Sequence, residues 1–154
     1  MKKKYKQIIN TFDVKGKELE PIINEFTFEE LEKFPQIRSN NKERFIENIY
    51  RKNRNREYKY RVSNLGNVEI REDNKNNYES AKIINHKSKG NGWLILEKHP
   101  SIYVYHLVAE TWLKKLDGNG WHVHHINDNG NDNRPENLIY LKSEVHNKLP
   151  KKTI

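Results

Sequence analysis

The segment at residues 121–146 constrains the fold of this chain more than any other part of the sequence. It contains a short alternating run, a loop rich in Asn and Asp, a second β-prone run at residues 138–141, and a short helix with Ser143 as its predicted cap. A hairpin that is followed by a helix folds back on itself, so a helix residue can face the end of the first strand. We therefore expect His124 and His146 to meet.

Histidine is concentrated in this same segment. The chain has seven histidines, and four of them lie within 25 residues: His122, His124, His125 and His146. Strand alternation places His124 and His125 on opposite faces, but at a frayed strand end both can serve one cavity in different roles. Because imidazole is a base near neutrality and its neutral form binds divalent metals, this favours a metal ligand beside a general base. An ordinary surface role is the better interpretation for His122 by itself, and for His86 and His99.

Composition limits how such a site can be built. The chain has no cysteine, which excludes disulfide partners and leaves only His, Asp, Asn or Glu to hold a metal. Two His ligands leave coordination positions open, as metal-assisted hydrolysis requires. The apolar fraction is 34%, so the core is small and a bound metal is one candidate for stabilising it. No apolar run is long enough to span a bilayer, and we expect no membrane partner and a cytoplasmic location.

The net charge of +8 comes mostly from the middle third of the chain. Its densest part is RKNRNREYKYR at residues 51–61, where six cations face one Glu and are interleaved with tyrosines. This pattern is typical of a surface that follows a nucleic-acid backbone, with a solvated helix end as the alternative. The predicted DNA-binding residues are Arg51, Lys52, Arg54, Arg56, Lys59 and Arg61.

The N-terminal part predicts two helices. The first 25 residues have no sustained period, and we expect them to be partly ordered at best. Thr27 and Glu30 form a capping-box pattern at the start of a short helix that Pro35 ends. Asn40 and Glu43 repeat that pattern, and the spacing of the apolar residues that follow predicts a second helix reaching about residue 54.

The remainder predicts strands followed by one helix. YKYRVSNLGNVEI, residues 58–70, alternates around a Gly-containing turn and predicts a hairpin. Residues 93–96 and 102–105 are β-rich runs, and helical spacing begins within residues 105–116. The fold class is therefore α+β, with N-terminal helices, a small antiparallel β-sheet and a C-terminal hairpin-helix unit.

The order of His125, eleven residues, Asn137, eight residues and His146 resembles the HNH (ββα-metal) nuclease motif. YKYRVSNLGNV resembles the module of the YxVSNLGxV type that precedes this motif in phage and intron-encoded homing endonucleases. VYHLVAETW, residues 104–112, resembles the helix that leads into it. Where the family commonly has His-Arg before Leu-Val-Ala, this chain has Tyr105 and His106.

The resemblance implies roles for four residues. His125 is the general base that takes a proton from the attacking water, and Asn137 orients that base and its loop. His124 and His146 hold one divalent cation, with Mg or Mn expected and Zn, Ni or Co possible, because two imidazoles make the site softer. The expected products carry a 5′ phosphate and a 3′ hydroxyl.

The resemblance also implies partners, and we expect the chain to have three parts, of which residues 1–57 do not match the family. We expect double-stranded DNA as the substrate, a monomer or homodimer, and action in a bacterial or phage-infected cell as a homing-type enzyme. Residues 1–57 form an N-terminal helical and basic extension, 58–99 a β-rich DNA-contacting module, and 100–154 the nuclease domain. The alternatives are a stand-alone defence or restriction nuclease, a nuclease of low specificity, and a DNA-binding protein whose nuclease site has decayed.

Overall fold

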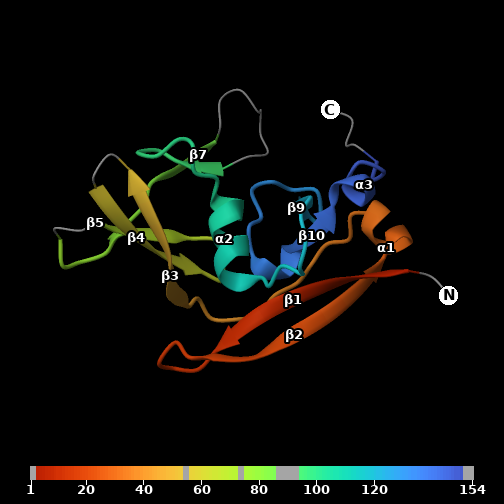
Figure 1. Cartoon of the computed structure of the whole chain (residues 1–154), viewed down its shortest axis with the longest axis horizontal. Coiled ribbons are helices and arrows are strands. Elements are labelled where there is room, and N and C mark those ends of the chain that lie inside the picture. Colours follow the sequence, from red (N-terminus) through yellow and green to blue (C-terminus); the bar gives the residue numbers. More distant parts are fainter. Residues whose placement is uncertain (1–2, 54–55, 73–74, 86–93, 151–154) are drawn as a thin grey trace.

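The structure is a computed structural model that describes residues 3–53, 56–72, 75–85 and 94–150 (Figure 1). It has the predicted α+β class, with short helices and small antiparallel sheets. The elements follow in this order: β1 (Lys4–Phe12), β2 (Glu18–Thr27), α1 (Phe28–Glu32), β3 (Phe45–Asn53), β4 (Arg56–Ser63), β5 (Val68–Glu72), β6 (Glu79–Ser80), β7 (Ile83–Asn85), β8 (Leu94–Leu96), α2 (Val104–Trp112), β9 (Trp121–His125), a 3₁₀ turn (Pro135–Asn137), β10 (Leu138–Lys142) and α3 (Ser143–His146). None of the described helices is long and apolar enough to cross a membrane.

Helix α2 occupies the centre of the molecule. On one side of it lies a four-stranded sheet in the order β3-β4-β5-β6, and on the other lie the β9–β10 hairpin and α3 (Figure 1). Buried Leu107, Val108 and Trp112 of α2 share one core with Tyr60 and Val62 of β4. The indole Nε1 of Trp112 also donates to the Val62 carbonyl at 2.9 Å. The sheet and the C-terminal unit are therefore held against a common helix.

Residues 4–27 form a β-hairpin, so the expectation of partial order is wrong for the described part of the N-terminal segment. β1 and β2 pair along most of their length. The side-chain amide of Gln7, which is 2% exposed, donates to three backbone carbonyls beside the start of β10: those of Pro135, Glu136 and Leu138, at 3.2, 2.8 and 2.7 Å. These partners lie more than 120 residues away in the sequence, so the local pattern of apolar residues does not predict this strand.

The first predicted helix is confirmed. Thr27 caps α1 by accepting a hydrogen bond from the Glu30 amide, and the Glu30 carboxylate accepts one from the Thr27 amide, which completes the capping box. Leu31 is fully buried and α1 ends before Pro35. Leu31 packs in a second core with Ile126 and Ile139, beneath the C-terminal hairpin.

The second predicted helix is wrong, because residues 45–53 form strand β3. The register against β4 shifts between Glu47 and Ile49, which is the mark of a β-bulge. The extra residue lets both Ile46 and Ile49 face the core, so a strand acquires a spacing of three between apolar residues. That spacing mimics one face of a helix.

The predicted hairpin at residues 58–70 is confirmed as β4 and β5. Its turn is held by the Ser63 hydroxyl oxygen, which accepts hydrogen bonds from the amides of Leu65 and Asn67 at 3.1 and 3.0 Å. Gly66 has φ +85°, and a Cβ built there would lie 3.2 Å from Cβ of Asn133 in the C-terminal loop. The turn therefore needs glycine both for its backbone conformation and for this close approach.

The predicted strands on either side of Pro100 are only half correct. Leu94–Leu96 forms β8, whereas Trp93 lies outside the described residues. The second run forms only an isolated bridge between Ile95 and Tyr103, because α2 already begins at Val104. Val104 is fully buried in the core, so packing decides its helical conformation over its β propensity.

Candidate functional site

The C-terminal hairpin and helix bring three imidazoles together, as the sequence predicts for two of them. The rings of His124 on β9 and His146 on α3 have centroids 5.4 Å apart. His122 joins them, since its ring stacks on that of His146 at 5.7 Å with an interplanar angle of 6°. Ser143 does not cap α3 through its side chain; its hydroxyl donates instead to the Gly120 carbonyl at 3.3 Å.

The ring of His124 is buried and uncharged. Its side chain is 6% exposed, and its Nε2 is buried without a hydrogen-bond partner in the part of the chain that the structure describes. Burial, followed by the charges of His146 and His125, lowers the pKa of His124 to about 3, so the ring is neutral at physiological pH. A buried neutral imidazole with an unused ring nitrogen fits a divalent cation.

The protein offers few further ligands at this place. Within the described ranges, no group of three or more His, Cys, Asp or Glu side chains is arranged to hold a metal ion. Asp128, from the loop after β9, lines one cavity together with His124 and His146. One of its carboxylate oxygens is buried and has no hydrogen-bond partner among the described residues. A cation held by His124 and His146 would therefore keep open positions for other ligands.

His125, the next residue of β9, is held by the Asn-rich loop. Its Nε2 lies 2.7 Å from Oδ1 of Asn133, and both side chains are buried. A carboxamide oxygen only accepts hydrogen bonds, so the proton of the neutral ring sits on Nε2 and the basic lone pair on Nδ1. Burial lowers the pKa of His125 below its usual 6.5, and the hydrogen bond to Asn133 opposes that shift. His125 is thus an oriented, neutral imidazole.

Asn137 closes the loop that carries Asn133. Its fully buried side chain accepts from the Asn127 amide at 3.0 Å and donates to the Asn127 Oδ1 and the Asp132 carbonyl, both at 2.8 Å. The side chain that accepts a hydrogen bond from Nε2 of His125 is Asn133, which the sequence pattern does not single out. Nothing in the local pattern distinguishes Asn133 from the other Asn residues of this loop, because its role depends on burial in the folded hairpin.

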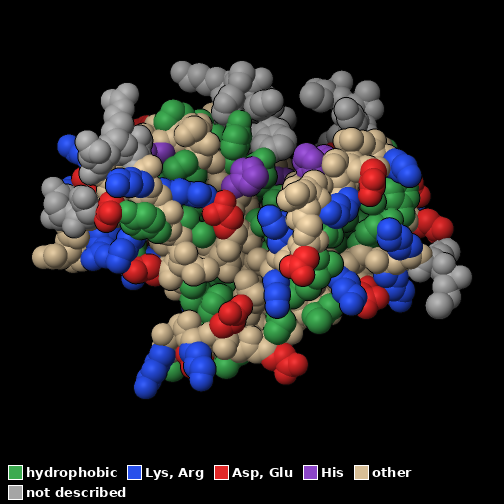
Figure 2. Space-filling view, in the orientation of Figure 1, with side chains coloured by type: hydrophobic (Ala, Val, Ile, Leu, Met, Phe, Trp, Pro, Cys, Tyr) green, Lys and Arg blue, Asp and Glu red, His purple; other side chains and the backbone are tan. Residues whose placement is uncertain are grey.

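A cavity of about 440 Å³ lies between α2 and the C-terminal unit. Its wall includes His124, His125 and His146, together with Tyr105 from α2, whose ring lies 5.5 Å from that of His125. Figure 2 shows histidine side chains at the surface between the two halves of the molecule, with cations and carboxylates around them. A cavity of this volume can hold a phosphodiester group and a metal ion.

The described members of the predicted DNA-binding set lie on more than one face of the β3–β4 hairpin. They lie on the β3–β4 hairpin rather than on a helix end, and Arg54 lies outside the described residues. Arg51 faces α2 and pairs with Glu110 at 2.7 Å. Strand alternation places Lys59 and Arg61 on the opposite face of the sheet from buried Tyr60.

Most of these cations already have acidic neighbours. Ion pairs join Arg56 to Glu72 at 4.0 Å, Lys59 to Glu47 at 3.9 Å and Arg61 to Glu69 at 2.9 Å. Exposed ion pairs contribute little to stability, in the range of roughly 0–1 kcal/mol, so a phosphate can displace the carboxylate at low cost.

Comparison with known proteins agrees with the site. Residues 106–148 match the sequence model of a family described as HNH endonuclease. The matched range contains every predicted catalytic and metal-binding residue: His124, His125, Asn137 and His146. A search of curated proteins and a search of solved structures each gave no match. HNH nucleases act on DNA and generally use a divalent metal. Residues 106–148 of this chain are therefore similar to the HNH endonuclease family.

Proposed function

We propose that this protein is a metal-dependent DNA endonuclease that hydrolyses phosphodiester bonds and leaves 5′ phosphate and 3′ hydroxyl ends. One observation carries the proposal: the rings of His124 and His146, with centroids 5.4 Å apart, lie beside the oriented ring of His125. The buried Nε2 of His124 supports a metal there, because a ring nitrogen of this kind gains a partner when a cation binds.

In this proposal His124 and His146 hold one divalent cation, Mg or Mn in the first instance and Zn, Ni or Co as softer candidates. When bound, the metal neutralises charge on the scissile phosphate and stabilises the leaving 3′ oxygen. Nδ1 of His125 accepts the proton of the attacking water, while Asn133 holds the Nε2 proton and with it the direction of the ring. Asn137 keeps the loop closed around both.

The remaining parts of the chain bind the substrate. Residues 58–99 are proposed to contact double-stranded DNA and residues 1–57 to extend that contact, with residues 100–154 as the nuclease domain. A homing role in a phage or mobile element follows from the likeness of YKYRVSNLGNV to the module found in such enzymes. This likeness covers β4, its turn and the start of β5.

The test is incubation of the protein with supercoiled plasmid and with its own flanking genomic DNA, in Mg, in Mn and in EDTA. We expect nicked or linear product with metal and none with EDTA. His146→Ala should abolish cleavage at every metal concentration, whereas His122→Ala, a matched change on the neighbouring ring, should leave cleavage measurable. Cleavage by His146→Ala at the wild-type rate would contradict the assignment of the metal site. A single cut in the flanking DNA supports homing, and many cuts support low specificity.

A further inference from the structure

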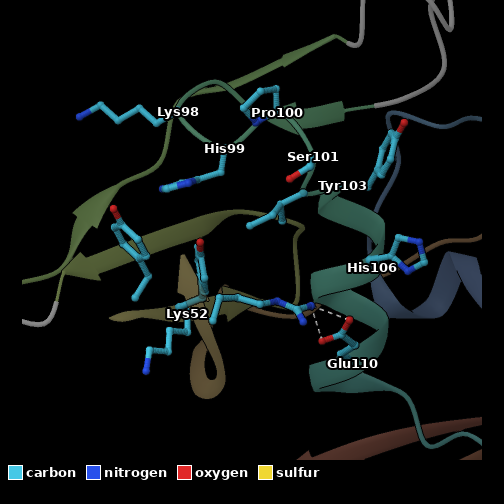
Figure 3. A pocket seen from close by; sticks show the side chains of 12 residues that line it. Lys52, Lys98, His99, Pro100, Ser101, Tyr103, His106 and Glu110 are labelled. Carbon is cyan, nitrogen blue, oxygen red and sulfur yellow. Dashed lines mark hydrogen bonds and ion pairs between the residues drawn. The ribbon is translucent and has the colours of Figure 1, made fainter. Parts of the chain in front are cut away.

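A second cavity, of about 590 Å³, lies between the four-stranded sheet, the segment at residues 98–103 and α2 (Figure 3). Its walls include Tyr58 and Tyr60 of β4, His99, and Tyr103 at the start of α2. His106 and Glu110 of α2 line both this cavity and the one that holds the three imidazoles. The two cavities are therefore neighbours along the same helix.

The wall of this cavity is formed in advance of any ligand. Backbone hydrogen bonds close the segment on itself: Leu96 N to Ile102 O at 3.2 Å, His99 N to Leu96 O at 3.2 Å and Ile102 N to His99 O at 2.9 Å. The ring of His99 also meets the ring of Tyr58 edge to face, with centroids 4.7 Å apart. A pre-formed wall lowers the ordering cost of binding.

The interior is aromatic and carries an unused hydroxyl. Tyr60 is fully buried, and its hydroxyl has no hydrogen-bond partner among the described residues. Burial raises the pKa of Tyr60 to about 12, so the group stays a neutral donor. Native structures seldom leave a buried hydroxyl without a partner, which points to an acceptor on a ligand.

The cations lie at the rim of the cavity. Lys52 and Lys98 are exposed, and in Figure 3 both extend outward, whereas the ring of His99 extends over the sheet. Arg51 is held at one side by both carboxylate oxygens of Glu110, each at 2.7 Å. A site for phosphate alone would turn its cations inward. Here aromatic side chains and a hydroxyl line the interior, which suits a base with its phosphates at the mouth.

We propose that this cavity binds one unpaired nucleotide of the substrate strand, with the base against the aromatic side chains and accepting a hydrogen bond from the Tyr60 hydroxyl, and the phosphates beside Lys52 and Lys98. The inference rests on the proposed nuclease function. The ring centroids of Tyr103 and Tyr105 lie 5.6 Å apart, and those of Tyr105 and His125 lie 5.5 Å apart. These contacts connect the cavity to His125, the proposed general base. The bound nucleotide therefore lies a few positions from the cut, since successive nucleotides rise about 3.4 Å in a duplex strand.

The test has a binding arm that does not depend on cleavage. The full-length protein is titrated with 2′-deoxyadenosine 5′-monophosphate and, separately, with inorganic phosphate, and backbone amide NMR shifts are followed. We expect the nucleotide, and not phosphate, to shift the amides of residues 96–103. Equal shifts with phosphate would identify a backbone-phosphate site and overturn the proposal, as would the absence of any shift with the nucleotide.

Tyr60→Phe is the decisive variant, because it removes a hydroxyl without a protein partner and should leave stability unchanged. It should weaken nucleotide binding roughly fivefold, the effect of one hydrogen bond. Lys17→Gln, an exposed cation on the turn of the N-terminal hairpin, is the control and should change nothing. Unchanged nucleotide affinity in Tyr60→Phe would overturn the proposed contact.

A cleavage arm separates this inference from the nuclease assignment. Duplexes with one unpaired nucleotide at successive positions are compared with a fully paired duplex. Wild type should prefer one fixed offset from the cut, and Tyr60→Phe should lose that preference while still cutting. Cleavage without any preferred offset overturns the inference alone. Nucleotide binding by a protein that cuts no DNA in any metal supports the cavity and overturns the nuclease function.

Discussion

The loop at residues 126–137 and the β3–β4 hairpin hold their polar side chains in opposite ways. In the loop, Asn127, Asn133 and Asn137 are almost fully buried and hydrogen-bond to one another's backbone, to each other or to His125. In the hairpin, the cations are largely exposed and pair with carboxylates across the sheet surface. The comparison indicates that the residues proposed for chemistry are fixed in place, whereas those proposed for DNA contact can exchange partners.

The largest difference should appear at His125. His125→Ala removes the proposed base from the fixed region, and cleavage should fall by about 10²- to 10⁴-fold. DNA binding, measured by fluorescence anisotropy in Mg, should stay within the wild-type range because the base does not hold the substrate. Wild-type cleavage by this variant would remove His125 from the mechanism.

Asn137→Ala should produce the largest loss of stability. It deprives the Asn127 amide and the Asp132 carbonyl of their buried partner, and unpaired buried groups cost about 1–3 kcal/mol each. We expect a loss of about 3 kcal/mol in the free energy of unfolding, measured by urea denaturation. The control is Asn129→Ala, which removes an exposed hydrogen bond to the Asn131 amide and should cost much less. Equal losses in the two variants would show that burial does not set the difference.

Asn133→Ala tests whether the amide that contacts His125 orients it. Cleavage should fall about tenfold, the effect of one lost buried hydrogen bond, with DNA affinity unchanged. Asn133→Asp keeps an acceptor at the same place and should recover more of the rate than Ala does. If both variants cut like wild type, the direction of the ring is set by other contacts.

The smallest effects are expected on the sheet. Lys52→Gln removes a cation at the rim of the second cavity, and Lys59→Gln removes one on the sheet face opposite buried Tyr60. If a cation contacts phosphate, its loss should reduce the slope of log affinity against log salt by about 1. Because Lys52 lies at the rim of the second cavity, we expect the reduction there and a smaller one for Lys59. Equal slopes for both variants and wild type would return the basic run to a solvated surface.

The same contrast explains what could be predicted from the sequence. The hairpin-helix unit is built from neighbours in the chain, and its apolar and polar pattern predicts β9, β10, α3 and the meeting of His124 with His146. The capping box at Thr27 is equally local. Both were therefore readable without a structure.

The elements that escaped prediction depend on distant contacts. β1 is fixed by Gln7 against carbonyls near β10, and β3 has a bulge that gives Ile46 and Ile49 a helical spacing. Asn133 acts only once the loop is closed by Asn137. In each case the tertiary structure decides the local conformation, and the local propensity of the sequence does not indicate it.

The approach of Gly66 to Asn133 bears on how this chain can be divided. The turn of the β4–β5 hairpin packs against Asn133, whose side chain contacts His125. The sheet therefore helps to fix the position of that side chain. A fragment of residues 100–154, or a graft of those residues onto another DNA-binding scaffold, would carry the four proposed site residues and still lack this contact. We therefore expect a chimera that includes the glycine turn to cut DNA better than one that lacks it.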